Sequence, residues 1–309
     1  MKNEIFELLQ QRADISARLT LLPHRGTPEI KEVNSKKYLY MRKRVAGKLL
    51  SEYVGDYNDD LYQLLLRNAS EEKALNKRMR EINRNLAKLG YTDEGIDARV
   101  LTNIDFARAN MKSNIYDQAI LEGVATSFPQ TEDIIENGTV NGMTSSDVQK
   151  ILNLKHAWEF ILDSDVIKCN SDYYLLCAVA KIVNEGFFYD GGRIRGVPVT
   201  IGGSSYIPPI PIELNVIEQI KQIQEEYTEP IDAAIELCLY CMKTQIFIDG
   251  NKRVSVIFAN HFLISKGQGF LVIPADNVPE FKKLLIAYYE GKDTERIKSF
   301  LRNKCWKNF

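Results

Sequence analysis

The sequence predicts an all-α, mainly helical chain with a small β-hairpin flap and an N-terminal accessory region of helix and hairpin. Three observations lead to this class. Apolar residues recur at spacings of three and four through most of the 309 residues, which indicates amphipathic helices. One Gly- and Pro-rich stretch, residues 191–211, interrupts this period. The formal charge is +6 over residues 1–90 and −7 over the remainder, which predicts an N-terminal module at 1–90 and a second domain at 91–309.

The composition excludes several classes of protein. A chain that is 45% hydrophobic and 26% charged is not expected to be disordered, collagen-like or a coiled-coil rod. Its net charge of −1 argues against a general preference for polyanions. The first 17 residues carry five charged side chains and no apolar run reaches about 18 residues, so we expect neither an export signal nor a membrane span. The odd number of cysteines, five, favours a reducing, cytoplasmic setting.

The N-terminal module is predicted to begin with a helix and a hairpin. Residues 3–22 have the helical period, and the Leu22-Pro23 step ends it. Residues 37–54 alternate with a period of two, which predicts a basic, aromatic hairpin that turns at Ala46-Gly47. Basic residues among tyrosines would suit a nucleic-acid backbone, but we interpret the hairpin as a solvated face and expect no nucleic-acid partner. The alternating side chains are Tyr38, Tyr40, Arg42 and Arg44 against Leu39, Met41 and Lys43.

A long helix is predicted at residues 58–89, with Gly90 as its stop. Its segment 71–88 mixes both signs of charge, and we interpret this segment as an exposed face or as the surface of a homodimer. The apolar stripe at helical spacing predicts the side of the helix that is buried. This buried side is expected to consist of Leu61, Leu64, Leu65, Leu75, Met79, Ile82 and Leu86.

Nine segments of the second domain have the helical period. Between the fourth and the fifth lies the stretch 191–211, which holds five Gly and four Pro around short β-branched runs and is interpreted as a flap or loose hairpin. The expected helices are residues 93–112, 117–127, 145–163, 172–188, 211–226, 230–247, 251–266, 277–289 and 294–305.

The most informative stretch is the polar turn Asp249-Gly250-Asn251-Lys252-Arg253, which joins two apolar helices. Gly250 and Asn251 tolerate backbone angles that let successive amides converge, and these amides lie at a helix start, where the dipole favours an anion. Lys252 and Arg253 add two cations, and Asp249 offers an oxygen ligand for Mg²⁺. The pattern fits a phosphate-binding nest, and it equally fits an ordinary joint between two helices.

At these residues the sequence resembles the Fic (Fido) family, whose hallmark is His-x-Phe-x-Asp/Glu-Gly-Asn-Gly/Lys-Arg-x-x-Arg. Phe247 and the five residues of the polar turn match that hallmark in order and spacing. Upstream, residues 202–211 are similar to the family's flap, which ends in Tyr-x-Pro-Pro-x-Pro. The resemblance covers roughly residues 93 to 305, and the N-terminal module resembles accessory regions found before some Fic domains.

A third match lies near the start of the second domain, in the helix expected at residues 117–127. Residues 119–123 resemble the family's inhibitory motif, Ser/Thr-x-x-x-Glu-Gly, with Gln118 where the Ser or Thr belongs. By this resemblance Glu122 is the regulatory carboxylate. The family brings this carboxylate close to the nucleotide, so Glu122 is also a candidate for a base.

The resemblance implies a mainly helical Fic fold that binds ATP with Mg²⁺ and transfers AMP to the hydroxyl group of a protein side chain. By match of position, Asp249 would hold the Mg²⁺, Gly250, Asn251 and Lys252 would bind the phosphates, and Arg253 would neutralise their charge. The flap would bind a segment of the target protein by strand addition. The flap residues expected to do so are Thr200, Ile201, Gly202, Gly203 and Tyr206.

The hallmark region, residues 245–256, departs from the family pattern at two positions. Gln245 stands where the family has its catalytic His, and glutamine does not accept a proton near neutrality. Val256 replaces the closing Arg, which pairs with the inhibitory Glu in the family, so Glu122 is expected to lack its usual partner. Lys252 is shared with the Doc-type toxins, which act as kinases. Three hypotheses stay open: a weakened protein adenylyltransferase, an inactive pseudoenzyme that binds nucleotide or peptide, and a Doc-like kinase.

Two other groups of residues are interpreted as structural. His261 lies roughly 12 Å beyond the polar turn along the following helix, and we expect a core histidine there instead of a replacement base. Cys238-x-x-Cys241 has a metal-like spacing, but no second pair accompanies it and Cys238 falls on the apolar stripe. Two packed thiols are therefore expected in preference to a zinc site.

Overall fold

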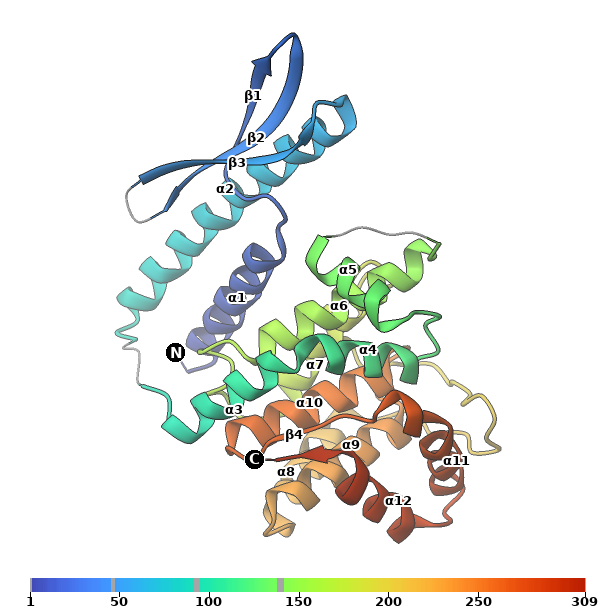
Figure 1. Cartoon of the computed structure of the whole chain (residues 1–309). Helices are drawn as coiled ribbons and strands as arrows, with labels where there is room; N and C mark the ends of the chain where they lie inside the picture. Colours follow the sequence, from blue (N-terminus) through green and yellow to red (C-terminus); the bar gives the residue numbers. More distant parts are fainter. Residues whose placement is uncertain (1, 46–47, 92–94, 138–141, 309) are drawn as a thin grey trace. The chain divides into compact units, whose positions relative to one another are not determined.

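The computed structural model describes residues 2–45, 48–91, 95–137 and 142–308, and these residues form a mainly helical protein (Figure 1). The predicted fold class is thereby confirmed. The contacts divide the chain into two compact units, Met1–Asp93 and Glu94–Phe309. Within the described residues, no helix combines the length and the hydropathy that a membrane span requires. The turn predicted at Ala46-Gly47 lies outside the described residues.

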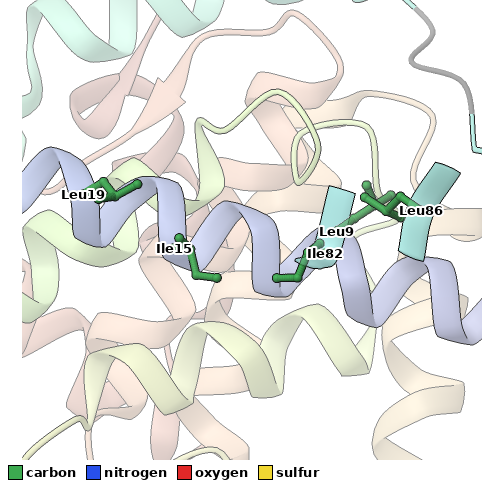
Figure 2. Packing of buried hydrophobic residues seen from close by; sticks show 5 residues of the cluster. All are labelled: Leu9, Ile15, Leu19, Ile82 and Leu86. Atoms are coloured by element: carbon green, nitrogen blue, oxygen red, sulfur yellow. The ribbon is translucent and has the colours of Figure 1, made fainter. Parts of the chain in front are cut away.

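In the first unit, helix α1 (Lys2–Leu21) packs against helix α2 (Asp59–Lys88). Asn58 caps α2 because its side chain accepts a hydrogen bond from the amide of Leu61 at 2.8 Å. Gly90 has a φ of +71° just after α2, the left-handed angle that commonly ends a helix. Figure 2 shows the side chains that form the core between the two helices, which are Leu9, Ile15, Leu19, Ile82 and Leu86.

A three-stranded antiparallel sheet completes the first unit, in the order β1 (Thr27–Val33), β2 (Lys36–Val45) and β3 (Lys48–Asp56). The predicted hairpin is confirmed as β2 and β3. Strand β1 was not predicted, because its sequence TPEIKEV contains Pro and lacks a clear apolar alternation.

The sheet's inner face packs against α2. Leu39 and Met41 of β2 are fully buried, and together with Leu65 of α2 they form a second core cluster. The expectation that Leu64 belongs to the buried side of α2 is wrong, since this side chain is 40% exposed. Leu65, one residue further along the helix, takes the place under the sheet because neighbouring helical positions point about 100° apart.

The second unit is built around helix α10 (Asn251–Ser265), in which every residue from Arg253 to Ile264 is buried. A helix that is buried on all sides must be enclosed by other elements, and α10 contacts α3, α6, α7, α9 and the short strand β4. The helices in chain order are α3 (Ala98–Ala109), α4 (Met111–Leu121), α5 (Phe128–Asn137), α6 (Ser145–Ile161), α7 (Tyr173–Val183), α8 (Glu213–Glu226), α9 (Pro230–Thr244), α10, α11 (Val278–Tyr289) and α12 (Thr294–Phe300).

Short elements finish the second unit. A 3₁₀ turn at Ala275–Asn277 precedes α11, and a π-helical turn at Leu301–Cys305 follows α12. Strands β4 (Phe270–Leu271) and β5 (Trp306–Lys307) form an antiparallel pair that joins the chain after α10 to the segment after α12. Helix α5 and both of these strands were not predicted from the sequence.

Several predicted elements differ in extent, among them the helix predicted at 172–188, which ends at Val183. The helix predicted at 93–112 breaks at Asn110, whose side chain donates to the Phe106 carbonyl at 2.9 Å in competition with the helical backbone. The helix predicted at 117–127 is the end of α4, and it stops at Leu121 because Gly123 adopts a φ of +77°. The flap, residues 191–211, lies between α7 and α8 as expected, but its residues form turns and extended chain without a paired strand.

Candidate active site

The polar turn lies between the end of α9 and the start of α10. Helix α9 ends at Thr244 instead of the predicted position 247, because Gln245 adopts the left-handed conformation with φ 49°. Asn251, the first residue of α10, holds the turn together: its side chain accepts from the Phe247 amide at 2.9 Å and donates to the Phe247 carbonyl at 2.8 Å. The amides at the start of α10 have no partners within the helix, which makes this turn suited to an anion.

Position 250 of the turn has no room for a residue other than glycine. Its φ is +74°, and a Cβ atom on this residue would lie only 2.5 Å from Oδ1 of Asn184. Asn184 is fully buried at the end of α7, and its Nδ2 donates to the carbonyls of Asp249 at 3.1 Å and Gly191 at 3.0 Å. One asparagine therefore fixes both the turn and the first residue of the flap.

A cavity of about 390 Å³ opens in front of the turn. Four segments of the second unit line it: the end of α4, the flap, the turn and α11. Lys282 and Tyr289 of α11 were not predicted as site residues, since an amphipathic helix without a motif carries no signal for a ligand. The lining residues are Glu122, Thr200, Ile201, Gly202, Gln245, Asp249, Gly250, Asn251, Lys252, Lys282, Leu285, Ile286 and Tyr289.

Glu122 projects into the cation pair of the turn. Its Oε1 lies 3.6 Å from Nζ of Lys252, and its Oε2 lies 3.5 Å from Nε of Arg253. The side chain of Arg253 is only 2% exposed and that of Glu122 only 11%, so the pair is largely shielded from water. As expected from Val256, Glu122 has no closing Arg as its partner, but two other cations contact it. Lys252 and Arg253 take that role, while Val256 is buried in the core.

The end of α4 places Glu122 at this position. The amide of Val124 donates to the Ala119 carbonyl at 3.0 Å, and the amide of Gly123 donates to the Ile120 carbonyl at 2.9 Å. This is the Schellman arrangement, which makes Glu122 the capping residue directly after the last residue of α4. Gln118, one turn earlier, donates to the Arg253 carbonyl at 3.0 Å, so α4 and α10 are joined directly.

The ion pair of Glu122 is held by charge without a direct hydrogen bond. Within the described residues, Oε1 of Glu122 and Nε of Arg253 are both buried and lack a hydrogen-bond partner. A buried polar atom without a hydrogen bond costs free energy. An incoming anion that accepts a hydrogen bond from Nε of Arg253 would therefore compete effectively with the carboxylate.

Asp249 offers the carboxylate that a cation would need. Its side chain is 56% exposed toward the cavity, and its Oδ2 lies 3.4 Å from Nη2 of Arg253. The described residues contain no group of three or more His, Cys, Asp and Glu side chains that could enclose a metal ion. Mg²⁺ is commonly held by one or two carboxylates together with substrate phosphates. Asp249 fits a Mg²⁺ ion that arrives with a polyphosphate.

Gln245 is part of the turn's scaffold. Its Nε2 donates to the Met242 carbonyl at 2.6 Å, and its Oε1 accepts from Nδ2 of Asn251 at 3.2 Å. The side chain reaches the edge of the cavity with both of its polar ends already hydrogen-bonded. The site can therefore bind and neutralise an anion, but Gln245 does not supply a proton acceptor.

Arg195 anchors the flap and was not predicted from the sequence. It is only 4% exposed, and its guanidinium donates to the carbonyls of five residues: Gln245 (2.5 Å), Pro209 (2.6 Å), Val197 (2.7 Å), Thr244 (3.3 Å) and Pro208 (3.3 Å). Burial lowers the pKa of this arginine. The carbonyls at the end of α9 carry the negative end of the helix dipole, which compensates the buried charge.

The far end of the flap rests on α11. Oε1 of Glu290 accepts hydrogen bonds from the amide and the hydroxyl of Ser205, each at 3.3 Å. The ring of Tyr206 stacks on Tyr289 with centroids 6.5 Å apart. The structure thus places Thr200, Ile201 and Gly202 at the cavity, whereas Gly203 and Tyr206 contact α11 beside it.

The structural interpretation of His261 is confirmed. Its ring nitrogens bond to the Ser171 hydroxyl at 2.7 Å and to the Val166 carbonyl at 2.8 Å. Burial lowers its pKa from 6.5 to about 4, so the ring is neutral at neutral pH. Cys238 and Cys241 are buried in α9 as free thiols, and burial raises the pKa of both.

Comparison with known proteins finds a family match over part of the chain, together with relatives of low sequence identity. Residues 171–263 match the Fic/DOC family, and residues 2–63 match a family described as a domain of unknown function, DUF6788. The chain is 26% identical over 258 residues to the protein adenylyltransferase Fic of Drosophila willistoni, covering 78% of this chain and 51% of that protein. The corresponding protein of Drosophila mojavensis is 25% identical, with 78% and 50% covered. The chain thus spans about half the length of these curated relatives.

Solved structures share the fold of the chain. Residues 134–508 of Fic-1 from C. elegans superpose with a TM-score of 0.51 at 20% sequence identity, covering 79% of this chain and 73% of that one. A Fic domain containing signaling protein from Bacteroides thetaiotaomicron gives a TM-score of 0.50 at 16% identity, with 62% and 75% covered. At these identities the likeness shows a common fold.

Proposed function

We propose, from the Fic/DOC family domain at residues 171–263, that this protein binds ATP with Mg²⁺ in the cavity and transfers AMP to a hydroxyl group of a target protein. The observation that carries the proposal is the turn Asp249–Arg253, which faces the cavity with an exposed carboxylate and a helix N-terminus. The adenylyltransferases of the two Drosophila species support the same reaction. The five free thiols support a reducing, cytoplasmic setting.

The turn and the flap each have a role in the proposed reaction. The start of α10 binds the phosphates through the backbone of Gly250 and Asn251, with Lys252 and Arg253 as counter-charges. Asp249 would hold Mg²⁺, which would neutralise charge that develops on the phosphates. The flap segment Thr200–Gly203 offers main-chain groups to an extended segment of the target protein.

Glu122 acts as an intramolecular competitor for the phosphates. It contacts both Lys252 and Arg253 in the structure, so a phosphate that binds these cations must first displace the carboxylate. Replacing Glu122 by a neutral residue removes that competition. We therefore propose that this contact restrains the activity of the site.

Gln245 lowers the rate of any transfer that needs a general base. A positioned base contributes about 10²–10⁴-fold to the rate of such reactions. The hydrogen bonds of Gln245 with Met242 and Asn251 show that its side chain stabilises the turn. This observation favours a second candidate function, in which the cavity binds nucleotide without transferring any part of it.

Labelled ATP distinguishes the candidates. The full chain is incubated with Mg²⁺, cell lysate and ATP labelled at either the α- or the γ-phosphate. Four proteins are compared: the natural sequence, Glu122→Gly, Gln245→His and the double variant. Glu132→Gly, which removes an acidic group outside the cavity lining, is the matched control for Glu122→Gly.

AMP transfer predicts protein labelling from the α-label only, with the double variant the most active. The increase on Gln245→His is expected to be about 10²–10⁴-fold. Labelling from the γ-phosphate would indicate a kinase instead. ATP binding without labelling in any of the four proteins would leave nucleotide binding as the function, and absence of binding would reject both proposals.

A further inference from the structure

The sheet of the first unit has an outer face whose side chains the core does not use. Leu39 and Met41 of β2 turn inward to α2, so the alternate residues of the same strand lie on the outer face. There, the strand register brings Tyr40 opposite Tyr53 of β3 and Tyr38 next to the same ring. Three tyrosines thus gather on the outer face without a packing role in the core cluster.

Two of the three rings each contact the third, which keeps an exposed surface. The centroid of Tyr53 lies 5.5 Å from that of Tyr40 and 6.2 Å from that of Tyr38. Nζ of Lys31 lies 4.3 Å from the centroid of Tyr40 and so occupies one side of that ring. Tyr53 is 53% exposed, and it is the ring in this cluster that offers most surface to a ligand.

The outer face also carries unpaired positive charge. Lys36, Arg42 and Arg44 belong to the same alternation as the tyrosines, they are exposed, and no carboxylate pairs with them within the described part of the chain. The acidic groups of this face are already engaged. Glu29 lies 3.8 Å from Lys31, and Asp56 accepts the hydroxyl of Tyr53 at 2.9 Å.

The inner-facing set of β2 and β3 has a different pattern. Lys43 bonds Glu52 at 2.5 Å, and Nζ of Lys37 lies 5.9 Å from the centroid of the Tyr57 ring, so both exposed lysines of β2 in that set already have a partner. The combination of open aromatic ring and unpaired cations is therefore confined to the outer face. A sheet face of this kind can stack an unpaired base on a ring while cations contact the phosphates.

We propose that the outer face of this sheet binds single-stranded nucleic acid, with a base stacked on Tyr53 and phosphates bound by Arg42, Arg44 and Lys36. The chain's net charge of −1 hides this property, because residues 1–90 carry +6. An acidic protein would pair with the cations only, and it would leave the three tyrosine rings without a group to stack on them. A duplex hides its bases from the ring, which is why a single strand is the preferred ligand.

Fluorescence anisotropy on the full chain tests this proposal. The probes are a fluorescein-labelled single-stranded DNA and RNA of mixed sequence, and the duplex of the same DNA. Binding is expected to fall steeply between about 50 and 200 mM salt, because phosphate contacts release counterions. Single strands are expected to bind more tightly than the duplex, and the DNA and RNA arms identify which of the two is preferred.

Two matched pairs of variants locate the site. Tyr53→Leu is expected to weaken binding by about fivefold or more because it removes a stacking surface, while Tyr53→Phe retains binding. The double variant Arg42→Ala with Arg44→Ala is expected to weaken binding and flatten the salt dependence. Arg67→Ala with Lys77→Ala removes the same charge from exposed positions of α2 and is expected to have little effect.

Four results would overturn the proposal. The first is the absence of binding to either single strand at low salt. The second is equal weakening by the control pair on α2, which would assign binding to charge anywhere on the unit. The third is unchanged binding in Tyr53→Leu when circular dichroism shows an intact fold. The fourth is competition by polyglutamate that is as effective as competition by the unlabelled strand.

Discussion

The two sides of the cavity are built in different ways. The turn between α9 and α10 is fixed by buried side chains, Asn184, Asn251 and Arg253, each of which bonds the backbone of a neighbouring segment. The flap has no paired strand, and its first half is held mainly by a single buried side chain, Arg195. The turn side of the cavity is thus fixed by several buried contacts, whereas the flap side depends on few.

This difference suits the two different tasks that we propose for the turn and the flap. A phosphate site needs backbone amides at fixed positions, and the asparagines and Gly250 supply that rigidity. A surface that receives a segment of another protein benefits from main-chain groups that are not already paired. Substitutions in the turn should therefore affect the stability of the whole unit, while substitutions at the flap's anchor should affect chiefly the flap.

The largest effect is expected for Gly250→Ala. The new Cβ atom adds left-handed strain of about 1–2 kcal/mol and a clash with Asn184 worth about 1–3 kcal/mol. The free energy of unfolding should fall by the sum of these costs. Urea unfolding followed by tryptophan fluorescence measures it, since both tryptophans, Trp158 and Trp306, lie in the second unit.

Gly291→Ala is the matched control for this prediction. Gly291 has a φ of +78°, and a Cβ atom there would meet no other atom within 4 Å. The free energy of unfolding of Gly291→Ala should fall only by the cost of the left-handed strain, about 1–2 kcal/mol. Equal losses in the two variants would show that Asn184 does not restrict the turn.

A smaller loss of stability, about 2–3 kcal/mol, is expected for Arg195→Gln, because buried carbonyls lose their donors. Hydrogen exchange should accelerate in the flap and remain slow in α10. Arg193→Gln, at an exposed position two residues earlier, is the control and should change neither quantity. Faster exchange throughout the second unit would contradict the assignment of Arg195 to the flap.

The pH dependence of stability probes the helix that supports the turn. His261 of α10 has its pKa lowered to about 4, against 6.5 when unfolded. Between these values the unfolded chain binds a proton that the folded chain does not, so stability should fall as the pH drops from 6.5 toward 4. The slope due to this group approaches about 1.4 kcal/mol per pH unit.

Comparing natural protein and His261→Gln over this pH range isolates that contribution. The variant is expected to be less stable near neutrality, because the bonds to Ser171 and Val166 change, and to show a shallower fall in acid. Parallel curves for His261→Gln and the natural protein would contradict the assignment.

The helices and the turn could be predicted from the sequence because their signals are local. The apolar period located α6, α9, α10 and α11 within a few residues, and the hallmark marked Asp249 to Arg253. The predicted helix ends were less accurate where one residue interrupts the helix. Asn110 does so through its side-chain hydrogen bond, and Gln245 does so through its left-handed backbone conformation. Strand β1 has too few apolar residues to reveal its pairing with β2.

The parts of the site that could not be predicted depend on contacts between distant segments. Arg195 and α11 contain no recognised motif, and their roles follow only from where the fold places them. The contacts of Glu122 with Lys252 and Arg253 could not be predicted for the same reason. The absence of one arginine at position 256 is visible in the sequence, but the approach of Lys252 and Arg253 to the end of α4 is not.

Calorimetric titration of the full chain with ATP and Mg²⁺ measures directly whether the cavity binds nucleotide in competition with Glu122. We expect that ATP binds and that Glu122→Gln binds it about tenfold more tightly, equivalent to about 1.4 kcal/mol. The affinity should rise because the phosphates no longer displace a carboxylate from Lys252 and Arg253. Glu132→Gln, which removes a charge outside the cavity lining, should leave the affinity unchanged. Failure of both the natural protein and Glu122→Gln to bind ATP, or equal affinities in the two, would contradict this expectation.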